Sequence, residues 1–169
     1  MKEKTGYKVP KKELRMFALG AMGQGMIYTM MSSYISDYYV NVLQLPLVFV
    51  LMLMLGARIW DAINDPMMGI LADSRSRKNG KMKSFIIYSA VPLAVFTILM
   101  YFCPELNKNG LMVYAAVIYV LWGMINTMAD VPMWSIPNVM TPDAEERGQV
   151  ISFAKILNGI GTAVPEVLF

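Results

Sequence analysis

The chain has 169 residues, of which 56% are hydrophobic and 16% are charged, whereas soluble domains are typically about 45–50% apolar and about 25% charged. It has no histidine and one cysteine, Cys103, which excludes histidine-based catalysis and metal binding, a disulfide within the chain and a thiolate metal cluster. The net charge of +3 does not indicate nucleic-acid binding, because the basic residues flank apolar segments and form no stripe of their own.

Five apolar segments are long enough to cross a bilayer as helices, which takes about 20 mainly apolar residues. In chain order they cover residues 14–41, 45–72, 84–103, 111–139 and 149–169. Turn signals lie between them at Pro46, at residues 107–110 and at residues 141–143. The pattern predicts an all-α polytopic membrane protein with about five transmembrane helices.

Basic residues lie mainly on one side of these helices. Six occur in the first 15 residues, Arg147 precedes the last helix, and five lie between the second and third helices: Arg75, Arg77, Lys78, Lys81 and Lys83. The other side has only Lys108. Because loops rich in lysine and arginine stay in the cytoplasm, we expect a basic cytoplasmic N-terminus over residues 1–13 and a multi-pass protein of the inner (plasma) membrane.

The first predicted helix has a polar side. Gln24, Tyr28 and Ser32 recur at spacings of four, so this side is a candidate for lining a cavity and binding substrate. The alternative is plain packing against another helix, for which Gly20 and Gly23 would permit a close approach.

The second predicted helix contains an arginine and two aspartates within its apolar length. Arg58, Asp61 and Asp65 are spaced by three and four residues, so they share one face of a helix. Ionisable residues inside a spanning helix are costly and indicate a functional site by default. Asn64 adds a further oxygen close to that face.

The tract after this helix is polar and basic. Its succession of Gly69, Asp73, Arg77, Gly80 and Lys81 suggests a specific gate-type turn and hinge at the cytoplasmic face. The simpler alternative is a solvated loop whose basic residues only fix the topology.

The fourth predicted helix carries a second polar face, formed by Thr127, Asp130 and Trp134 at spacings of three and four. Counted from helix starts at 45 and 111, the depths of Asp61, Asp65 and Asp130 agree to within about one turn. If the two faces converge, three carboxylates and neutral oxygens surround one point. Such a site suits a hard cation such as Na⁺, or a shared proton.

The same charges have a structural alternative, an internal salt-bridge network in which Arg58 neutralises Asp61. This network accounts for one aspartate well and for three poorly, because one arginine leaves two negative charges to be offset. Both interpretations stay open at this point.

Trp134 and Lys155 are candidates for contacts with a sugar. Trp134 offers a flat apolar platform beside the carboxylate of Asp130, although tryptophan is also common at membrane interfaces. Lys155, in the fifth predicted helix, either extends towards the cytoplasmic side, or binds substrate, or offsets the carboxylates.

Two stretches closely resemble a known family: "ARIWDAINDPMMGILADSRSRKNGKMK" and "YVLWGMINTMADVPMWSI". They are similar to the glycoside–pentoside–hexuronide:cation symporters of the major facilitator superfamily. The resemblance implies a twelve-helix fold of two six-helix halves, of which this chain would be about the first five helices. It also implies coupled import of a sugar or glycoside with Na⁺, H⁺ or Li⁺. The chain ends near its fifth helix, so we expect a fragment that lacks the C-terminal half.

The resemblance also assigns roles to single residues. The family's cation-site aspartates match Asp61 and Asp65, and its fourth-helix threonine and aspartate match Thr127 and Asp130. Its stacking tryptophan matches Trp134. An arginine of the sugar site is matched by Lys155, which keeps the charge but loses the planar fork, and a first-helix aspartate is matched by Gly25. The resemblance therefore does not establish α-galactoside specificity.

Two other classes of protein compete with this interpretation. The spacing of Asp61, Asp65, Gly69 and Asp73 loosely echoes the membrane CDP-alcohol phosphotransferases, but Asp65 is followed by Pro66 instead of the glycine that their motif needs. We therefore expect no enzyme. A non-transporting membrane protein, either a truncated relic or a partner subunit, remains the alternative. The sequence names neither the sugar nor the coupling cation.

Overall fold

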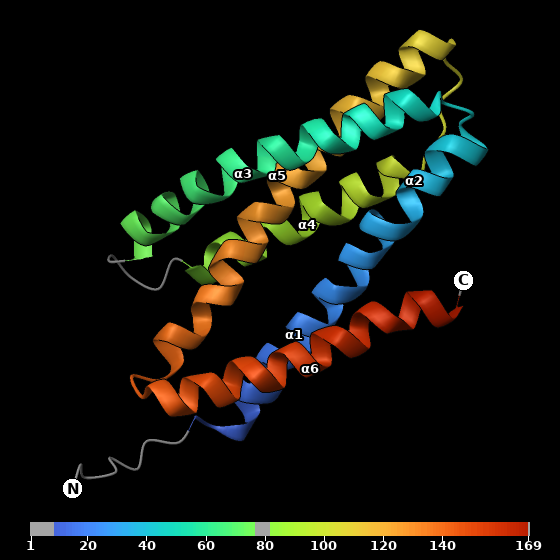
Figure 1. Ribbon diagram of the computed structural model, residues 1–169. Helices are drawn as coiled ribbons and strands as arrows, with labels where there is room; N and C mark the ends of the chain where they lie inside the picture. Colours follow the sequence, from blue (N-terminus) through green and yellow to red (C-terminus); the bar gives the residue numbers. More distant parts are fainter. Residues whose placement is uncertain (1–8, 77–81, 169) are drawn as a thin grey trace, which may run out of the picture. The chain divides into compact units, whose positions relative to one another are not determined.

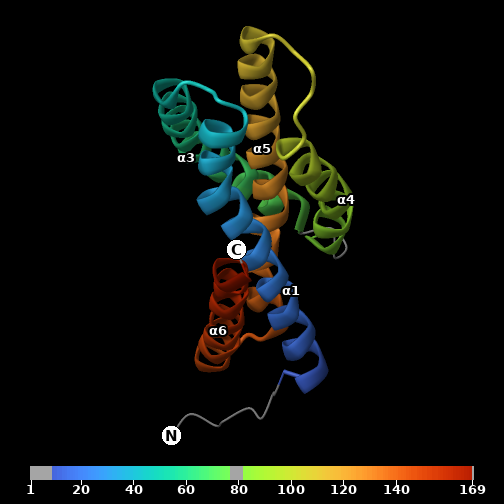
Figure 2. The same ribbon diagram turned by 90° about the vertical axis from the view of Figure 1, so that its right-hand side faces the viewer.

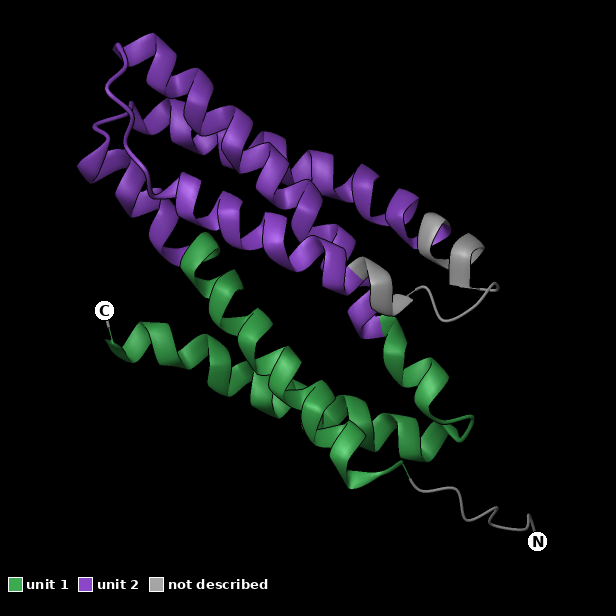
Figure 3. Ribbon diagram, turned by 180° about the vertical axis from the view of Figure 1, so that it is seen from behind, with its two compact units in different colours: residues 1–32, 135–169 green, residues 33–134 purple. Residues whose placement is uncertain are grey.

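The computed structural model describes residues 9–76 and 82–168, except the side chains of residues 71–76 and 82–85. Every regular element within these residues is a helix (Figure 1), which confirms the predicted all-α fold. The chain divides into two compact units, Met1–Ser32 with Ser135–Phe169, and Ser33–Trp134 (Figure 3). The first unit contains α1 and α6, and the second contains α3, α4 and most of α5.

The helices follow one another through short connections. In chain order the elements are α1 (Lys11–Thr29), η1 (Met30–Tyr34), α2 (Ile35–Asp37), η2 (Tyr38–Val42), α3 (Leu47–Ser76), α4 (Met82–Met100), α5 (Lys108–Met140) and α6 (Ala144–Leu168). The η segments are π-helical, so the chain stays helical from residue 11 to residue 42, where the sequence predicted a helix over 14–41.

Side-chain caps set the starts of α5 and α6. The Asn107 Oδ1 atom accepts a hydrogen bond from the Gly110 N–H at 2.8 Å, so α5 begins at residue 108 instead of the predicted 111. The Asp143 Oδ1 atom accepts one from the Glu145 N–H at 3.0 Å, so α6 begins at residue 144 instead of 149. Both caps satisfy donors that the first turn of a helix otherwise leaves open.

In the first unit, α1 and α6 pack side by side (Figure 2). Their backbones approach closely at Gly25 and Gly161, where a Cβ atom would meet the carbonyl groups of Asn158 and Met22 respectively. The Asn158 Nδ2 atom also donates a hydrogen bond to the Ala21 carbonyl at 2.8 Å. Glycines allow this approach because two backbones can then come into direct contact.

This packing corrects one expectation from the sequence. Gly20 and Gly23 were expected to allow the close approach, but a Cβ atom at either position would have no other described atom within 4 Å. The reason is the helical face: buried residues of α1 such as Ala18, Ala21 and Gly25 recur at three and four, and Gly20 and Gly23 lie off this stripe.

In the second unit, hydrogen bonds join α4 to α5. Trp122 is only 1% exposed, and its Nε1 donates to the Thr97 Oγ1 atom at 2.8 Å. Nearer the start of α5, the Tyr114 hydroxyl donates to the Leu99 carbonyl at 2.7 Å. These bonds satisfy polar groups that would otherwise be buried without partners.

Two helices of the described residues are long and apolar enough to cross a membrane. They are Leu47–Ile70 within α3 and Lys108–Met140, each with a mean hydropathy of 1.7. A shorter apolar helix, Ile86–Met100, lies in α4. Length and hydropathy by themselves therefore single out two of the five predicted spans.

Candidate cation and sugar site

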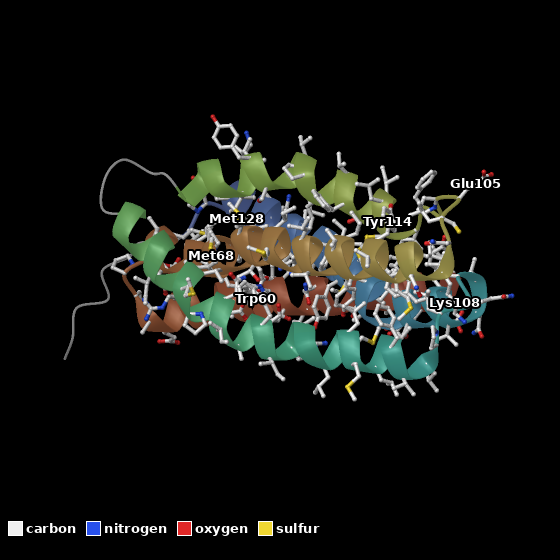
Figure 4. The ribbon with its side chains drawn as sticks, turned by 90° about the horizontal axis from the view of Figure 1, so that it is seen from above. Trp60, Met68, Glu105, Lys108, Tyr114 and Met128 are labelled. Carbon is white, nitrogen blue, oxygen red and sulfur yellow. The ribbon has the colours of Figure 1, made fainter. Side chains whose placement is uncertain are left out.

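The candidate cation site lies where α3 faces α5 in the second unit. In Figure 4, Trp60 and Met68 bracket the α3 part of the site, and Met128 marks its α5 part. The Thr127 Oγ1 atom donates a hydrogen bond to Asp65 Oδ1 at 3.0 Å, and Thr127 is only 6% exposed. The structure thus brings two predicted cation ligands from different helices into direct contact.

A glycine on α5 lies next to Asp61, the other predicted cation ligand on α3. A Cβ atom at Gly123 would lie 3.6 Å from Asp61 Oδ1, so Asp61 approaches the α5 backbone one turn before Thr127. Both pairs, Asp61 with Gly123 and Asp65 with Thr127, are 62 positions apart. An equal offset means that the two helices run in the same direction with a fixed register over this turn.

Asp65 is the electrostatic centre of this group. Its charge acts on both Asp61 and Asp130, while the Arg58 guanidinium acts on Asp61 with the opposite sign. Asp61 and Asp130 are half-buried, whereas Arg58 and Asp65 are exposed. One guanidinium among three ionised carboxylates leaves an excess of two negative charges, and the partial burial of Asp61 and Asp130 makes their charges costly.

The three carboxylates do not converge on one point. Among the described residues, no three aspartate, glutamate, histidine or cysteine side chains lie close enough together to hold a metal ion. Asp130 is three residues, or about 4.5 Å of helix rise, beyond Thr127. The structure therefore shows pairwise proximity around Asp65, whereas the sequence left open whether the two faces converge on one point.

Asn64 points a polar group into the second unit. The residue is 7% exposed, and its Nδ2 atom has no hydrogen-bond partner among the described residues. Buried amides are nearly always hydrogen-bonded to protein or water. An amide at this position therefore has capacity for a ligand, and a half-turn of the amide group would present its oxygen in place of its nitrogen.

Asp130 and Trp134 form a joint polar and aromatic group on α5. The Trp134 side chain hydrogen-bonds to the Asp130 carboxylate, and both residues are half-buried. The indole N–H is the only hydrogen-bond donor of tryptophan, so the faces of the ring remain for apolar contacts. The spacing of four residues places the two side chains together, as the sequence predicts.

The other predicted substrate residues belong to the first unit. Gln24 is half-buried on α1, Tyr28 is exposed one turn later, and Lys155 is exposed on α6. Gly25, which stands where the family resemblance has an aspartate, is buried against the Asn158 carbonyl. A side chain at position 25 would have to displace the backbone of α6.

Two residues of the predicted gate-type turn are helical in the structure. Gly69 and Asp73 lie inside α3, which continues to residue 76, and a Cβ atom at Gly69 would have no other described atom within 4 Å. Arg77, Gly80 and Lys81 lie outside the described residues. Gly69 is therefore a helical residue that packing does not require to be glycine.

Sequence reasoning missed two contacts that shape these helices. Gly123 precedes Thr127 by four residues, and this spacing could have marked it as the neighbour of Asp61. Asn158 could have been found as the polar residue one turn beyond Lys155, but its acceptor, Ala21, is 137 positions away.

Known proteins show similarity to nearly the whole chain. Residues 16–169 match the family model described as MFS/sugar transport protein. The inner membrane symporter YicJ of Escherichia coli (strain K12) is 31% identical over 99% of this chain and 34% of its own length. The putative glycoside/cation symporter YagG of the same organism is 28% identical over 96% of the chain and 33% of its own length.

A third relative, the isoprimeverose transporter of Lactiplantibacillus pentosus, is 26% identical over 92% of the chain and 33% of its own length. The chain thus spans about a third of the length of these relatives. The family match covers more than nine-tenths of the chain, and its relatives are membrane transporters by name. The chain therefore belongs to the MFS/sugar transport protein family, and its resemblance to the glycoside–pentoside–hexuronide:cation symporters is confirmed.

Proposed function

We propose that this chain carries the cation site and part of the sugar site of a cation-coupled sugar or glycoside symporter. The observation that supports the proposal best is the Thr127–Asp65 hydrogen bond, which joins the two described helices that are long and apolar enough to cross a membrane. Relatives named as symporters support the same reaction class. The activity is proposed for a transporter of the relatives' length, with this chain as its first five helices and a C-terminal half as its partner.

The coupling cation is Na⁺ or H⁺, with Li⁺ as a further candidate, and it is transported cargo. We assign its binding to oxygen atoms of Asp61, Asn64, Asp65, Thr127 and Asp130. The excess of two negative charges gives a monovalent cation its electrostatic driving force. A cation bound at Asp65 offsets the repulsion from Asp130 and so draws the two carboxylates together.

The sugar binds next to the cation through Asp130 and Trp134. Its hydroxyl groups hydrogen-bond to the Asp130 carboxylate, and an apolar face of the sugar ring stacks on the indole. Because Asp130 serves both ligands, each ligand raises the affinity for the other. We assign further substrate contacts to Gln24, Tyr28 and Lys155.

Transport follows when the two halves of the transporter rock and expose the site to the other side of the membrane. Arg58 is the counter-charge of the site, and the segment from Gly69 through Asp73, Arg77, Gly80 and Lys81 acts at the gate. The protein lies in the inner membrane with a cytoplasmic N-terminus, and it transports its substrate without chemical conversion.

Uptake of labelled glycosides, pentosides and hexuronides by the transporter containing this chain tests the proposal, with and without an imposed Na⁺ or H⁺ gradient. We expect Asp65→Asn to abolish gradient-driven uptake while sugar binding persists. Asp143→Asn is the matched control, because it removes a carboxylate outside the site and keeps a capping side chain. Gradient-driven uptake that survives Asp65→Asn contradicts the cation site, and no uptake of any sugar by the unaltered protein favours the non-transporting alternative.

A further inference from the structure

One carboxylate in the first unit makes two hydrogen bonds to segments far apart in the sequence. The Glu146 Oε1 atom accepts a hydrogen bond from the Val9 backbone N–H at 2.6 Å. Its Oε2 atom accepts one from the Thr141 hydroxyl, also at 2.6 Å. Both distances are in the short range typical of bonds to a charged acceptor, so Glu146 holds the chain before α1 against the turn before α6.

The Thr141 hydroxyl extends this network into the cap of α6. Thr141 is fully buried, and its Oγ1 accepts a hydrogen bond from the Asp143 N–H at 3.2 Å while donating to Glu146. In an ordinary capping box, the glutamate in the first turn bonds directly to the N-cap N–H. Here the threonine hydroxyl relays that bond, which leaves the second carboxylate oxygen available to Val9.

The Oε1 atom of Glu146 accepts its hydrogen bond just before α1, a helix that has no side-chain cap of its own. The N-cap residue of α1 is Pro10, which makes no side-chain capping bond. A carboxylate is favourable near a helix N-terminus because it complements the helix dipole. Glu146 lies in the first turn of α6 and next to the start of α1, so one negative charge serves the N-terminal ends of two helices.

The pairing has the same register at two separate points. Val9 with Glu146 and Ala21 with Asn158 are both 137 positions apart, so α1 and α6 run in the same direction. The two points are 12 residues apart in sequence, which corresponds to about 18 Å of helix rise along α6. The glycine contacts and the Asn158 bond hold the middle of the pair, and Glu146 adds an attachment at its N-terminal end.

We propose that Glu146 is a positioning residue that makes α1 and α6 move as one rigid pair. The Asn158 contact and the glycine contacts hold the middle of the pair, and the Glu146 carboxylate holds its N-terminal end. On the proposed function, this rigidity keeps Gln24 and Lys155, which lie on different helices of the pair, at a constant separation. The inference itself concerns only the 169-residue chain and is tested without transport.

The experiment compares Glu146→Ala, Thr141→Val and Thr141→Ser in the whole chain, in detergent or lipid nanodiscs. Amide exchange of Val9 reports its hydrogen bond to the carboxylate. Spin labels at two exposed positions, Lys12→Cys and Gln149→Cys in a Cys103→Ser background, report the spread of distances between the helix ends. Neither readout requires sugar, cation or a second half.

We expect Val9 amide exchange to become about tenfold faster in Glu146→Ala, because a bond to a charged acceptor is lost. The distance distribution should broaden in Glu146→Ala and in Thr141→Val, while Thr141→Ser keeps the hydroxyl and resembles the unaltered chain. If Glu146→Ala does not fold, the Thr141 pair decides alone.

Two results overturn the proposal. The first is Val9 exchange and label distances that are unchanged in both Glu146→Ala and Thr141→Val. The second is faster exchange confined to the first turn of α6, with Val9 unaffected, which reduces Glu146 to the cap of its own helix. A transport defect without either change concerns the proposed function and not this inference.

Discussion

Gly25 offers the sharpest test of how the first unit is packed. In Gly25→Ala, the new methyl group would lie 2.5 Å from the Asn158 carbonyl oxygen and 3.2 Å from the Thr162 backbone nitrogen. Both neighbours are backbone atoms of α6, so they move only if the helix moves. Overpacking of this kind costs about 1–3 kcal/mol, and a shift of α6 also weakens the 2.8 Å bond from Asn158 to Ala21.

Gly20→Ala is the matched control, because a Cβ atom there meets nothing within 4 Å. Replacing glycine by alanine inside a helix stabilises it by about 1 kcal/mol through backbone entropy alone, and this gain applies at both positions. The difference between the two variants therefore isolates the steric contribution. We expect the free energy of unfolding of Gly25→Ala to be about 1–3 kcal/mol lower than that of Gly20→Ala.

Thermal unfolding of the chain in detergent, followed by helical circular dichroism, measures this difference. For a chain of this size, each kcal/mol corresponds to about 2–4 °C in Tm. Equal Tm values for Gly25→Ala and Gly20→Ala would refute the packing argument. They would also remove the structural reason why an aspartate is absent from position 25.

Three further predictions concern the second unit. Thr127→Val should raise the cation concentration for half-maximal uptake about tenfold or more, because it removes an oxygen and a bond to a charged group. Thr127→Ser keeps the hydroxyl and should not raise this concentration. Equal concentrations in the two variants would contradict a ligand role for Thr127. Gly123→Ala should retain uptake, because the new Cβ atom would lie at an ordinary contact distance of 3.6 Å from Asp61 Oδ1. Gly123→Leu should abolish uptake, and full uptake by the leucine variant would refute the close approach of Asp61 to α5. Trp122→Phe should lower unfolding free energy by about 0.6–1.7 kcal/mol, the range for hydrogen bonds between membrane helices, and unchanged Tm argues against the bond to Thr97.

Much of the fold was predictable, because the lengths of the apolar segments and the turn residues between them are local properties of the sequence. The starts of α5 and α6 lie three and five residues before those that the sequence predicts, because hydropathy marks Asn107 and Asp143 only as turn residues. In the structure each of them also caps the helix that follows. Helix caps depend on side-chain hydrogen bonds over two or three residues, which hydropathy does not register.

Contacts between helices were less predictable, because they depend on which faces meet. Gly20, Gly23 and Gly25 look alike in the sequence, yet only Gly25 lies on the stripe that contacts α6. The Glu146 network was also not predicted, since its donor, Val9, lies 137 positions away. The spacing of charged residues along α3 was informative because it follows from helix geometry alone.

A shift of a few residues in a helix boundary changes which side chains lie level at the cation site. The predicted helix starts, 45 and 111, imply an offset of 66 and place Asp130 level with Asn64. The contacts of the structure give an offset of 62, which places Asp130 level with Met68. Four residues correspond to about 6 Å of helix rise, enough to separate the carboxylate of Asp130 from those on α3.

Side-chain tilt does not close this gap. Because α3 and α5 run in the same direction, the Cα–Cβ bonds of both helices tilt towards the N-termini alike, so the levels of Asp65 and Asp130 differ as much as their backbones do. A longer side chain at position 130 would reduce the difference. Asp130→Glu should therefore keep more cation-dependent uptake than Asp130→Asn, because the longer side chain retains the charge and can reach the same level. Equal loss of uptake in the two variants would argue that Asp130 acts only through its contact with Trp134.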